Sequence, residues 1–224
     1  MTMMPQTYPT SGGSSTPRGV SPGRRAIDVL VAGTALLALS PVLLVVAMLV
    51  RLTSPGPVIF RQRRVTTGRR EFTMYKFRTM RTDCEGPDLT RSGDARVTGP
   101  GRVLRRTSLD ELPQLLNVLR GDMTLVGPRP ETPALAACYP TELKWILDQT
   151  PGLTGPAQIS LRDDVALDGS PADIERWYVE NLVPRRIAVD QTFLADPSVP
   201  ATLVVLARTV RYLVTGRRWV PQGG

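Results

Sequence analysis

The sequence of 224 residues contains no histidine, only two cysteines and few aromatic residues (5%). Without histidine there is no imidazole base, no Ser-His-Asp or Cys-His nucleophile system and no His-ligated zinc. Cys84 and Cys138 lie far apart and form no CxxC pair. A reduced, cytosol-facing location therefore fits them better than a disulfide scaffold. Acid–base or nucleophilic chemistry must depend on carboxylates, Lys, Tyr, Cys or hydroxyl groups.

Acidic residues are fewer than basic ones, 20 against 28, and the formal charge is +8 with a pI near 10.3. Such a surface attracts anions, and charge alone leaves nucleic acid, acidic lipid and phosphorylated metabolites open. The length and the 42% hydrophobic content suit one packed domain with an attached arm. No Walker A loop and no GxGxxG motif occurs, so P-loop or Rossmann nucleotide binding has no support.

The N-terminal part changes character abruptly. Residues 1–23 are rich in Pro, Gly, Ser and Thr and predict a disordered tail. Residues 29–50 carry no charge, and about 22 helical residues extend roughly 33 Å, enough to cross the hydrocarbon core of a bilayer. We interpret this run as a membrane segment; a buried helix of a soluble domain is the alternative.

Ser40-Pro41 stands at the midpoint of that run. Proline removes a backbone donor and clashes with the preceding turn, so a kink is expected there. Arginines flank the run on both sides: Arg18, Arg24, Arg25, Arg51, Arg61, Arg63 and Arg64. Because positive flanks favour the cytoplasmic side, we prefer a re-entrant helix that dips in and returns over a kinked single span.

Beyond the membrane segment, residues 58–60 and 71–80 predict the strands of a hairpin that turns at Thr67-Gly68. The charges of this hairpin are almost all positive, which suits either solvent or anionic lipid headgroups. Residues 82–102 are turn-rich. Residues 200–216 predict an amphipathic helix, and its basic and Trp-containing end leaves an interfacial helix open beside a core helix.

The strongest helical pattern outside the membrane segment begins at Asp110 and Glu111. Five leucines are expected to share one face: Leu109, Leu112, Leu115, Leu116 and Leu119. Gly121 is expected to end the helix. Ser108-x-x-Glu111 has the spacing of a capping box, and Asp110 suits the positive end of the helix dipole, so a structural role is one interpretation.

Catalysis by this pair is the other interpretation. Adjacent carboxylates diverge by about 100° around a helix and cannot flank a sugar from opposite faces. One nucleophile with one assistant, or one metal ligand with a base, remains open. Nearby, Arg129 stands between Pro128 and Pro130, and a guanidinium held in this way suits phosphate; an ion pair with Glu131 is the alternative. Residues 151–155 predict a tight loop.

Three strings occur together: KFRTM at 76–80, LRRTSLDELPQLLNVLRGDMTLVGPRPE at 104–131 and PGLTGPAQ at 151–158. Together they resemble the bacterial sugar transferase family, the monotopic phosphoglycosyl transferases that start glycan assembly on a polyprenyl phosphate. The resemblance implies an α/β (α+β) fold, with a small mixed catalytic domain at 53–224 and interfacial helices. It also implies a re-entrant membrane helix at 24–52, kinked at Ser40 and Pro41, in the bacterial inner membrane with the catalytic domain facing the cytoplasm.

The resemblance also implies roles for individual residues. Asp110 would be the nucleophile that attacks the β-phosphate of a UDP-sugar, releases UMP and forms a covalent phosphosugar–aspartate. Glu111 would assist, as base for the polyprenyl phosphate acceptor, and Mg²⁺ would bind beside Asp110. The candidate substrate-binding residues are Lys76, Arg78, Arg105, Arg129 and Arg162, of which Arg129 would help recognise the nucleotide. Mg²⁺ and fixed cations would offset the repulsion between anionic substrates and an anionic nucleophile.

The sequence departs from the family at Leu161, where a glycine is usual, and over residues 181–200, which look longer than usual. Larger members carry a multi-span N-terminal region that is not seen here, so we expect a minimal form. A non-catalytic membrane-bound scaffold of the same fold is the alternative function. Nucleic-acid binding is disfavoured, because the basic residues adjoin a membrane segment and lack an aromatic stacking platform. In the transferase interpretation anionic membrane lipid is a further partner.

Overall fold

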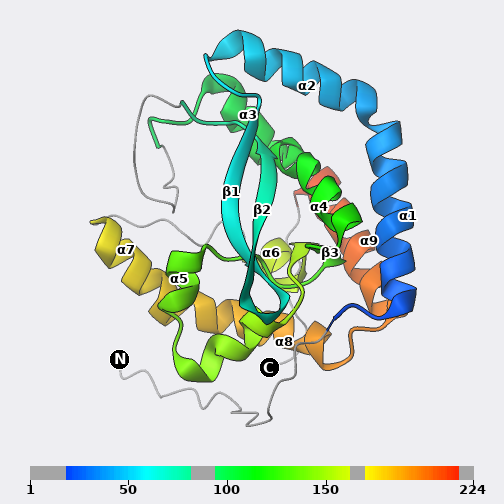
Figure 1. Ribbon diagram of the computed structural model, residues 1–224, viewed down its shortest axis with the longest axis vertical. Coiled ribbons are helices and arrows are strands. Elements are labelled where there is room, and N and C mark those ends of the chain that lie inside the picture. Colours follow the sequence, from blue (N-terminus) through cyan, green and yellow to red (C-terminus); the bar gives the residue numbers. More distant parts are fainter. Residues whose placement is uncertain (1–18, 82–93, 162–169, 217–224) are drawn as a thin grey trace.

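The computed structural model describes residues 19–81, 94–161 and 170–216 and has a mixed α/β architecture with two small sheets (Figure 1). This confirms the predicted mixed α/β fold class. In chain order the labelled elements are α1 (Pro22–Ala38), α2 (Ser40–Thr53), β1 (Ile59–Thr66), β2 (Arg70–Phe77), α3 (Gly99–Thr107), α4 (Leu115–Arg120), β3 (Thr124–Val126), α5 (Pro133–Ala137), β4 (Gly152–Thr154), α6 (Pro156–Ser160), α7 (Pro171–Trp177), α8 (Val183–Ala195) and α9 (Val199–Thr215). Short 3₁₀ segments at Thr67–Arg69, Leu109–Gln114 and Thr141–Asp148 and a π-turn at Tyr178–Leu182 connect them.

The N-terminal helix pair bends by 63° between α1 and α2. The break falls at Leu39, directly before Ser40-Pro41, and the Ser40 hydroxyl donates to the Leu37 carbonyl at 2.8 Å. Proline cannot continue the hydrogen-bond ladder, and a neighbouring serine satisfies a freed carbonyl. In the described ranges no single helix is long and apolar enough to cross a membrane, whereas this bent pair reaches the required length and composition when its two halves are taken together.

The predicted hairpin is confirmed. Strands β1 and β2 pair antiparallel from Ile59 opposite Phe77 to Thr66 opposite Arg70, and the turn places Gly68 in the left-handed region at φ 68°. The second strand ends at Phe77 instead of Met80, which forms an isolated bridge with Val97. Figure 1 shows the hairpin running through the middle of the molecule, with α3 and α4 beside it.

The segment predicted as turn-rich contains a helix, α3. Thr98 caps its N-terminus by accepting a hydrogen bond from the Gly101 nitrogen, and Gly99-Pro100 open it despite their loop-like composition. Glycine and proline are common in loops, but proline is also favoured in a first helical turn, where its missing N–H leaves no bond unmade. Residues 82–93 of the same prediction lie outside the described residues.

The helix expected from Leu109 begins as a 3₁₀ segment and becomes α-helical only at Leu115. Because a 3₁₀ turn contains three residues instead of 3.6, the phase of the side chains shifts. The prediction of one leucine face is therefore wrong: Leu109 packs in the cluster with Val46 and Phe77, whereas Leu115 packs with Phe72, and Leu116 is 44% exposed. Gly121 ends α4 in the left-handed region, as predicted.

The predicted tight loop at 151–155 is instead the short strand β4, which pairs parallel with β3. The two strands approach so closely that a Cβ on Gly152 would lie 2.1 Å from the Gly127 nitrogen. Glycine is thus required by close backbone approach and not by a turn. The pairing brings the segment after Val126 next to the segment after Thr154.

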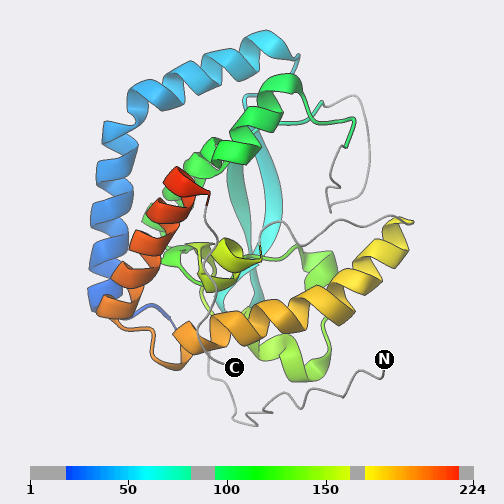
Figure 2. The same cartoon turned by 180° about the vertical axis from the view of Figure 1, so that it is seen from behind.

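The C-terminal helices α8 and α9 pack against α6, and α9 also contacts β3. Helices α7 and α8 form one long rod through the π-turn, and α9 lies beside α1, as both views show (Figure 2). The predicted helix at 200–216 is confirmed as α9, whose Val205 packs with Phe72, Met74 and Val118. Its opposite face exposes apolar side chains, among them Val210 and Val214 at 60% and 79%.

Candidate functional site

Asp110 and Glu111 lie in the 3₁₀ segment packed against β2, and Asp110 is only 7% exposed. Before them the chain turns sharply at Ser108, whose φ of 59° is unusual for a residue other than glycine. In this conformation the Ser108 side chain makes no capping hydrogen bond. The predicted capping box is therefore wrong: the Glu111 carboxylate turns toward cations on neighbouring elements instead of back to Ser108.

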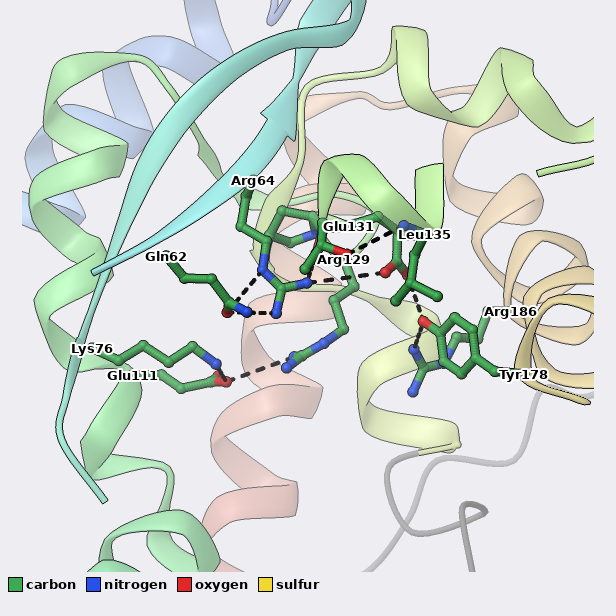
Figure 3. Close-up of polar contacts among 11 residues, drawn as sticks. Gln62, Arg64, Lys76, Glu111, Arg129, Glu131, Leu135, Tyr178 and Arg186 are labelled. Atoms are coloured by element: carbon green, nitrogen blue, oxygen red, sulfur yellow. Dashed lines mark hydrogen bonds and ion pairs between the residues drawn. The ribbon is translucent and has the colours of Figure 1, made fainter. Parts of the chain in front are cut away.

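Two of these cations meet at one Glu111 oxygen, as Figure 3 shows. Lys76 Nζ on β2 lies 2.8 Å from Glu111 Oε1, and Arg129 Nη1 lies 3.6 Å from the same atom. The Lys76 and Glu111 side chains are 15% and 22% exposed, so the pair is partly shielded from water, whereas Arg129 is 37% exposed. Partial burial strengthens such charge-assisted contacts relative to those on an open surface.

Asp110 belongs to the same electrostatic group. Burial lowers the pKa of Lys76, while the charges of Glu111 and Asp110 oppose that effect. Burial also lowers the pKa of Arg105, and Asp110 again acts against it. For Arg129 burial acts downward, but Glu111 and the other nearby anionic groups, Asp110 included, outweigh it and raise its pKa. Three cations from separate elements thus surround two adjacent carboxylates.

Arg105, on α3, is oriented by Thr79, whose hydroxyl oxygen accepts from Arg105 Nε at 2.7 Å. Arg78 occupies a different place. It is 4% exposed and donates to the Ser54 and Pro55 carbonyls, both at 2.7 Å, at the end of α2. These contacts anchor α2 to the hairpin and give Arg78 a structural role. Arg162 lies outside the described residues.

A second polar group holds the turn that carries Arg129. Arg64 Nη1 on β1 donates to the Pro130 carbonyl at 3.0 Å and lies 4.0 Å from Glu131 Oε2. Tyr178 donates its hydroxyl to Glu131 Oε1, and Arg186 Nη1 donates to the Tyr178 oxygen at 2.8 Å (Figure 3). The ion pair of Arg129 with Glu131, considered from sequence, is wrong: Arg129 pairs with Glu111 and Glu131 with Arg64.

The sequence pattern predicts no role in the site for Tyr178 or for Arg64, which belongs to the basic flank of the membrane segment. No local signal could have identified them, because Arg64 bonds to Pro130 across 66 residues and Tyr178 to Glu131 across 47. Asn117 is a further structural partner: buried in α4, it joins that helix to β2 through the Tyr75 nitrogen and the Thr73 carbonyl.

A cavity opens behind the Arg129 turn. Its lining includes Glu131, Tyr139, Arg186 and Asp190. Asp190 on α8 is 4% exposed, and its Oδ1 accepts a hydrogen bond from the Ala157 nitrogen at 2.9 Å. Burial raises the pKa of Asp190 to about 7, against the opposing effects of that hydrogen bond and of Arg186.

The carboxylates of the site are potential ligands for Mg²⁺. Within the described ranges no three Cys, Asp or Glu side chains gather as a protein-only metal site. Mg²⁺, however, is commonly held by one or two carboxylates together with substrate phosphates and water. The buried Asp110, with cations beside it to contact those phosphates, fits that second mode.

Comparison of the sequence with known proteins identifies a family. The sequence profile of the bacterial sugar transferase family matches residues 20–216. A UDP-glucose:undecaprenyl-phosphate glucose-1-phosphate transferase of Caulobacter vibrioides is 41% identical over 197 residues, which cover 86% of this chain and 70% of the relative. The exopolysaccharide production protein ExoY of Rhizobium meliloti is 35% identical over 223 residues, covering 92% of this chain and 91% of the relative.

A third relative is longer. The UDP-N-acetylgalactosamine-undecaprenyl-phosphate N-acetylgalactosaminephosphotransferase of Aeromonas hydrophila is 36% identical over 198 residues, and the match covers 86% of this chain but 44% of the relative. The shared part therefore spans less than half of that protein. Because the family profile covers nearly the whole chain, the protein belongs to the bacterial sugar transferase family and is an enzyme of the undecaprenyl-phosphate sugar phosphotransferase type.

Proposed function

We propose that the protein transfers a sugar-1-phosphate from a UDP-sugar to a polyprenyl phosphate, releasing UMP, through a covalent aspartyl–phosphosugar intermediate. One observation carries this proposal: Asp110, buried beside Glu111, is surrounded by Lys76, Arg105 and Arg129. The site thus offers an anionic nucleophile within a positive environment, which is what attack on a diphosphate requires. The names of the relatives support the same donor and acceptor classes.

In the first step, an Asp110 carboxylate oxygen attacks the β-phosphorus of the UDP-sugar. The bond from that phosphorus to the oxygen bridging the two phosphates breaks, UMP leaves with the electron pair, and the sugar phosphate is joined to Asp110. Arg129 and Arg105 are placed to contact the phosphate oxygens, because fixed guanidinium groups match phosphate geometry. The 3₁₀ segment holds Asp110 against β2 and limits the freedom of the nucleophile.

In the second step, an oxygen of the polyprenyl phosphate attacks the same phosphorus and the bond to Asp110 breaks. The products are a polyprenyl diphosphate sugar and the free carboxylate. Glu111 is the proposed base that accepts a proton from the acceptor phosphate. Its contacts with Lys76 and Arg129 hold the carboxylate in place for this role.

Magnesium is the proposed cofactor, held by Asp110 with the diphosphate of the donor. When bound, it would neutralise charge on the transferring phosphoryl group. Lys76, Arg105 and Arg129 supply the fixed positive charge that the chain itself contributes. Their arrangement on three separate elements lets them surround the phosphates from several sides.

A lipid acceptor needs an active site at membrane depth. We propose that α1 and α2 enter the membrane as a re-entrant pair, with the catalytic domain on the cytoplasmic face of the bacterial inner membrane. The bent pair and its exposed apolar side chains support this, for example Leu37 and Leu52 at 79% and 80% exposed. The exposed face of α9, which lies beside α1, is a second surface suited to lipid (Figure 2).

The experiment is a UMP-release assay with several UDP-sugars and undecaprenyl phosphate, in detergent or nanodiscs, with Mg²⁺ present. Wild type is expected to release UMP with at least one donor and to gain the mass of one sugar phosphate when the acceptor is withheld. Asp110→Asn should show neither signal, and Asp122→Asn, which changes a half-buried aspartate after Gly121, should behave as wild type. Turnover by purified Asp110→Asn protein at the wild-type rate would refute the nucleophile.

The same screen identifies the sugar. The relatives are named for glucose and for N-acetylgalactosamine, so both donors belong in it, and ExoY points to exopolysaccharide assembly as the context to test. We propose accordingly that the product begins a bacterial exopolysaccharide or related glycan.

A further inference from the structure

We propose that Arg64 and Glu131 are positioning residues for Arg129: together they fix the Pro-Arg-Pro turn so that the Arg129 guanidinium faces Glu111. This inference rests on the proposed function, in which Arg129 contacts the donor phosphates. It assigns a role to two charged residues, the half-buried Arg64 and the buried Glu131, that lie outside the group formed by Asp110, Glu111 and their cations.

The backbone of the turn is held from two sides. The Pro128 carbonyl accepts from the Gly152 nitrogen of β4 at 2.8 Å. On the other side of Arg129, the Pro130 carbonyl accepts from Arg64 Nη1 at 3.0 Å, and the Glu131 carbonyl accepts from the Val65 nitrogen at 2.9 Å. The turn is therefore hydrogen-bonded to both β4 and β1. These bonds fix the backbone position from which the Arg129 side chain extends.

Arg64 is the side chain that makes this attachment from β1. It is itself oriented by Gln62, whose Oε1 accepts from Arg64 Nη2 at 2.8 Å and from Nε at 3.2 Å. Its charge faces Glu131 Oε2 at 4.0 Å, and the two side chains are 12% and 7% exposed. Removing one member of such a buried pair leaves the other charge uncompensated, so the remaining partner must move toward water or another group.

Glu131 also connects the Pro-Arg-Pro turn to the α7–α8 helices, through Tyr178. Tyr178 begins the π-turn between α7 and α8, and its hydroxyl donates to Glu131 Oε1. The Arg186 guanidinium of α8 donates to that hydroxyl and lies 5.3 Å from the Tyr178 ring centroid. π-Helical turns are rare and often occur at functional sites, and the one here begins with Tyr178, a hydrogen-bond partner of Glu131.

The arrangement explains how Arg129 can face Glu111 although it is 37% exposed. The two flanking prolines restrict the backbone conformation of the turn, but they do not fix its position relative to the strands. If the Arg64–Glu131 pair is lost, the turn can shift relative to β2, which carries Lys76. A displacement of about 1 Å at a phosphate-binding group is enough to cost roughly 100-fold in rate.

A double-mutant cycle in kcat/KM for the UDP-sugar separates positioning from a general effect on folding. The variants are Glu131→Gln, Arg129→Ala and the two combined. Glutamine keeps an acceptor for Tyr178 but removes the charge that faces Arg64. Glu131→Gln should lose roughly 10- to 100-fold in wild-type background and almost nothing in Arg129→Ala background, because an effect that acts through Arg129 disappears with it.

Glu71→Gln is the matched control. Glu71 pairs with Arg63 at 2.8 Å on the same hairpin, but its side chain is 45% exposed, so the loss of that pair should leave kcat/KM unchanged. Wild-type activity in Glu131→Gln, or an equal fold loss in both backgrounds, would overturn the inference.

A second measurement does not depend on turnover. Modification of Arg129 by phenylglyoxal, followed by peptide mass spectrometry, should proceed several-fold faster in Glu131→Gln than in wild type or Glu71→Gln, because the loosened turn exposes the guanidinium. An unchanged modification rate would contradict positioning. If wild type releases no UMP with any donor, the proposed function fails, while this measurement still decides whether Glu131 fixes Arg129.

Discussion

The Asp28 carboxylate, fully buried in α1, accepts a hydrogen bond from the Leu125 nitrogen of β3 at 2.9 Å. Its second oxygen accepts from the Thr124 hydroxyl at 2.8 Å. Arg25, near the start of the same helix, donates to the Val118 and Leu119 carbonyls at the end of α4. The first turns of α1 therefore contact α4 and β3, which connect the segment of Asp110 to the turn of Arg129.

This contact predicts that Asp28 is needed for stability. Asp28→Ala should lower the free energy of unfolding by about 1–3 kcal/mol, because it leaves the Leu125 nitrogen and the Thr124 hydroxyl without their acceptor. Asp28→Asn should cost less, since its amide oxygen can still accept from Leu125. Thermal unfolding in detergent gives both values, and equal midpoints for wild type and Asp28→Ala would contradict the prediction.

Lys76 is expected to serve catalysis more than stability. Lys76→Met should lower kcat/KM for the UDP-sugar by about 100-fold, the scale of losing one fixed charge at a developing anion. Lys76→Arg should recover part of the loss, because it restores the charge but not the 2.8 Å contact with Glu111. UMP release at fixed Mg²⁺ measures the change; an activity near wild type in Lys76→Met would remove Lys76 from the site.

Asp190 predicts a pH dependence of stability. Its pKa in the folded protein is raised to about 7, from an ordinary value of 3.8, so between these values the folded state binds more protons than the unfolded state. Asp190 therefore makes stability fall as pH rises through this window, by at most about 1.4 kcal/mol per pH unit. Asp190→Asn should flatten that fall and exceed wild type in thermal midpoint near pH 8. Parallel curves for the two proteins from pH 5 to 8 would exclude the effect.

The re-entrant topology predicts where the N-terminus lies. With Cys84 and Cys138 changed to serine, a cysteine introduced by Ser15→Cys should react with a membrane-impermeant maleimide only after the cells are opened. A second variant, Arg217→Cys near the end of the sequence, should give the same pattern and serves as the reference. Labelling of Ser15→Cys in intact spheroplasts would indicate a spanning helix.

Exchanging the proline at the bend tests the same topology from the other direction. Pro41→Leu should straighten α1 and α2 toward a single helix, because leucine restores the missing donor and removes the clash with the preceding turn. In the labelling assay this variant should place residue 15 outside in a measurable fraction of molecules. Unchanged protection would show that the bend does not depend on Pro41.

The sequence alone determined the features that depend on neighbours along the chain. Two strand-like stretches on either side of Thr67-Gly68 predicted the hairpin, Gly121 predicted the end of α4, and Pro41 predicted a bend in an uncharged run. The strings around Asp110 and Arg129 indicated the family. These features follow from local backbone preferences and hydrophobic pattern, which a single sequence displays directly.

Only the tertiary structure decided which partner each charged side chain takes. Glu111 had Ser108 available as a capping partner nearby in sequence but pairs with Lys76, 35 residues away, because the left-handed turn at Ser108 and the 3₁₀ geometry direct the carboxylate toward β2. Glu131 had Arg129 two residues away but pairs with Arg64. The choice between a near and a distant partner depends on burial and on the direction of each side chain, and both arise only when separate elements pack together.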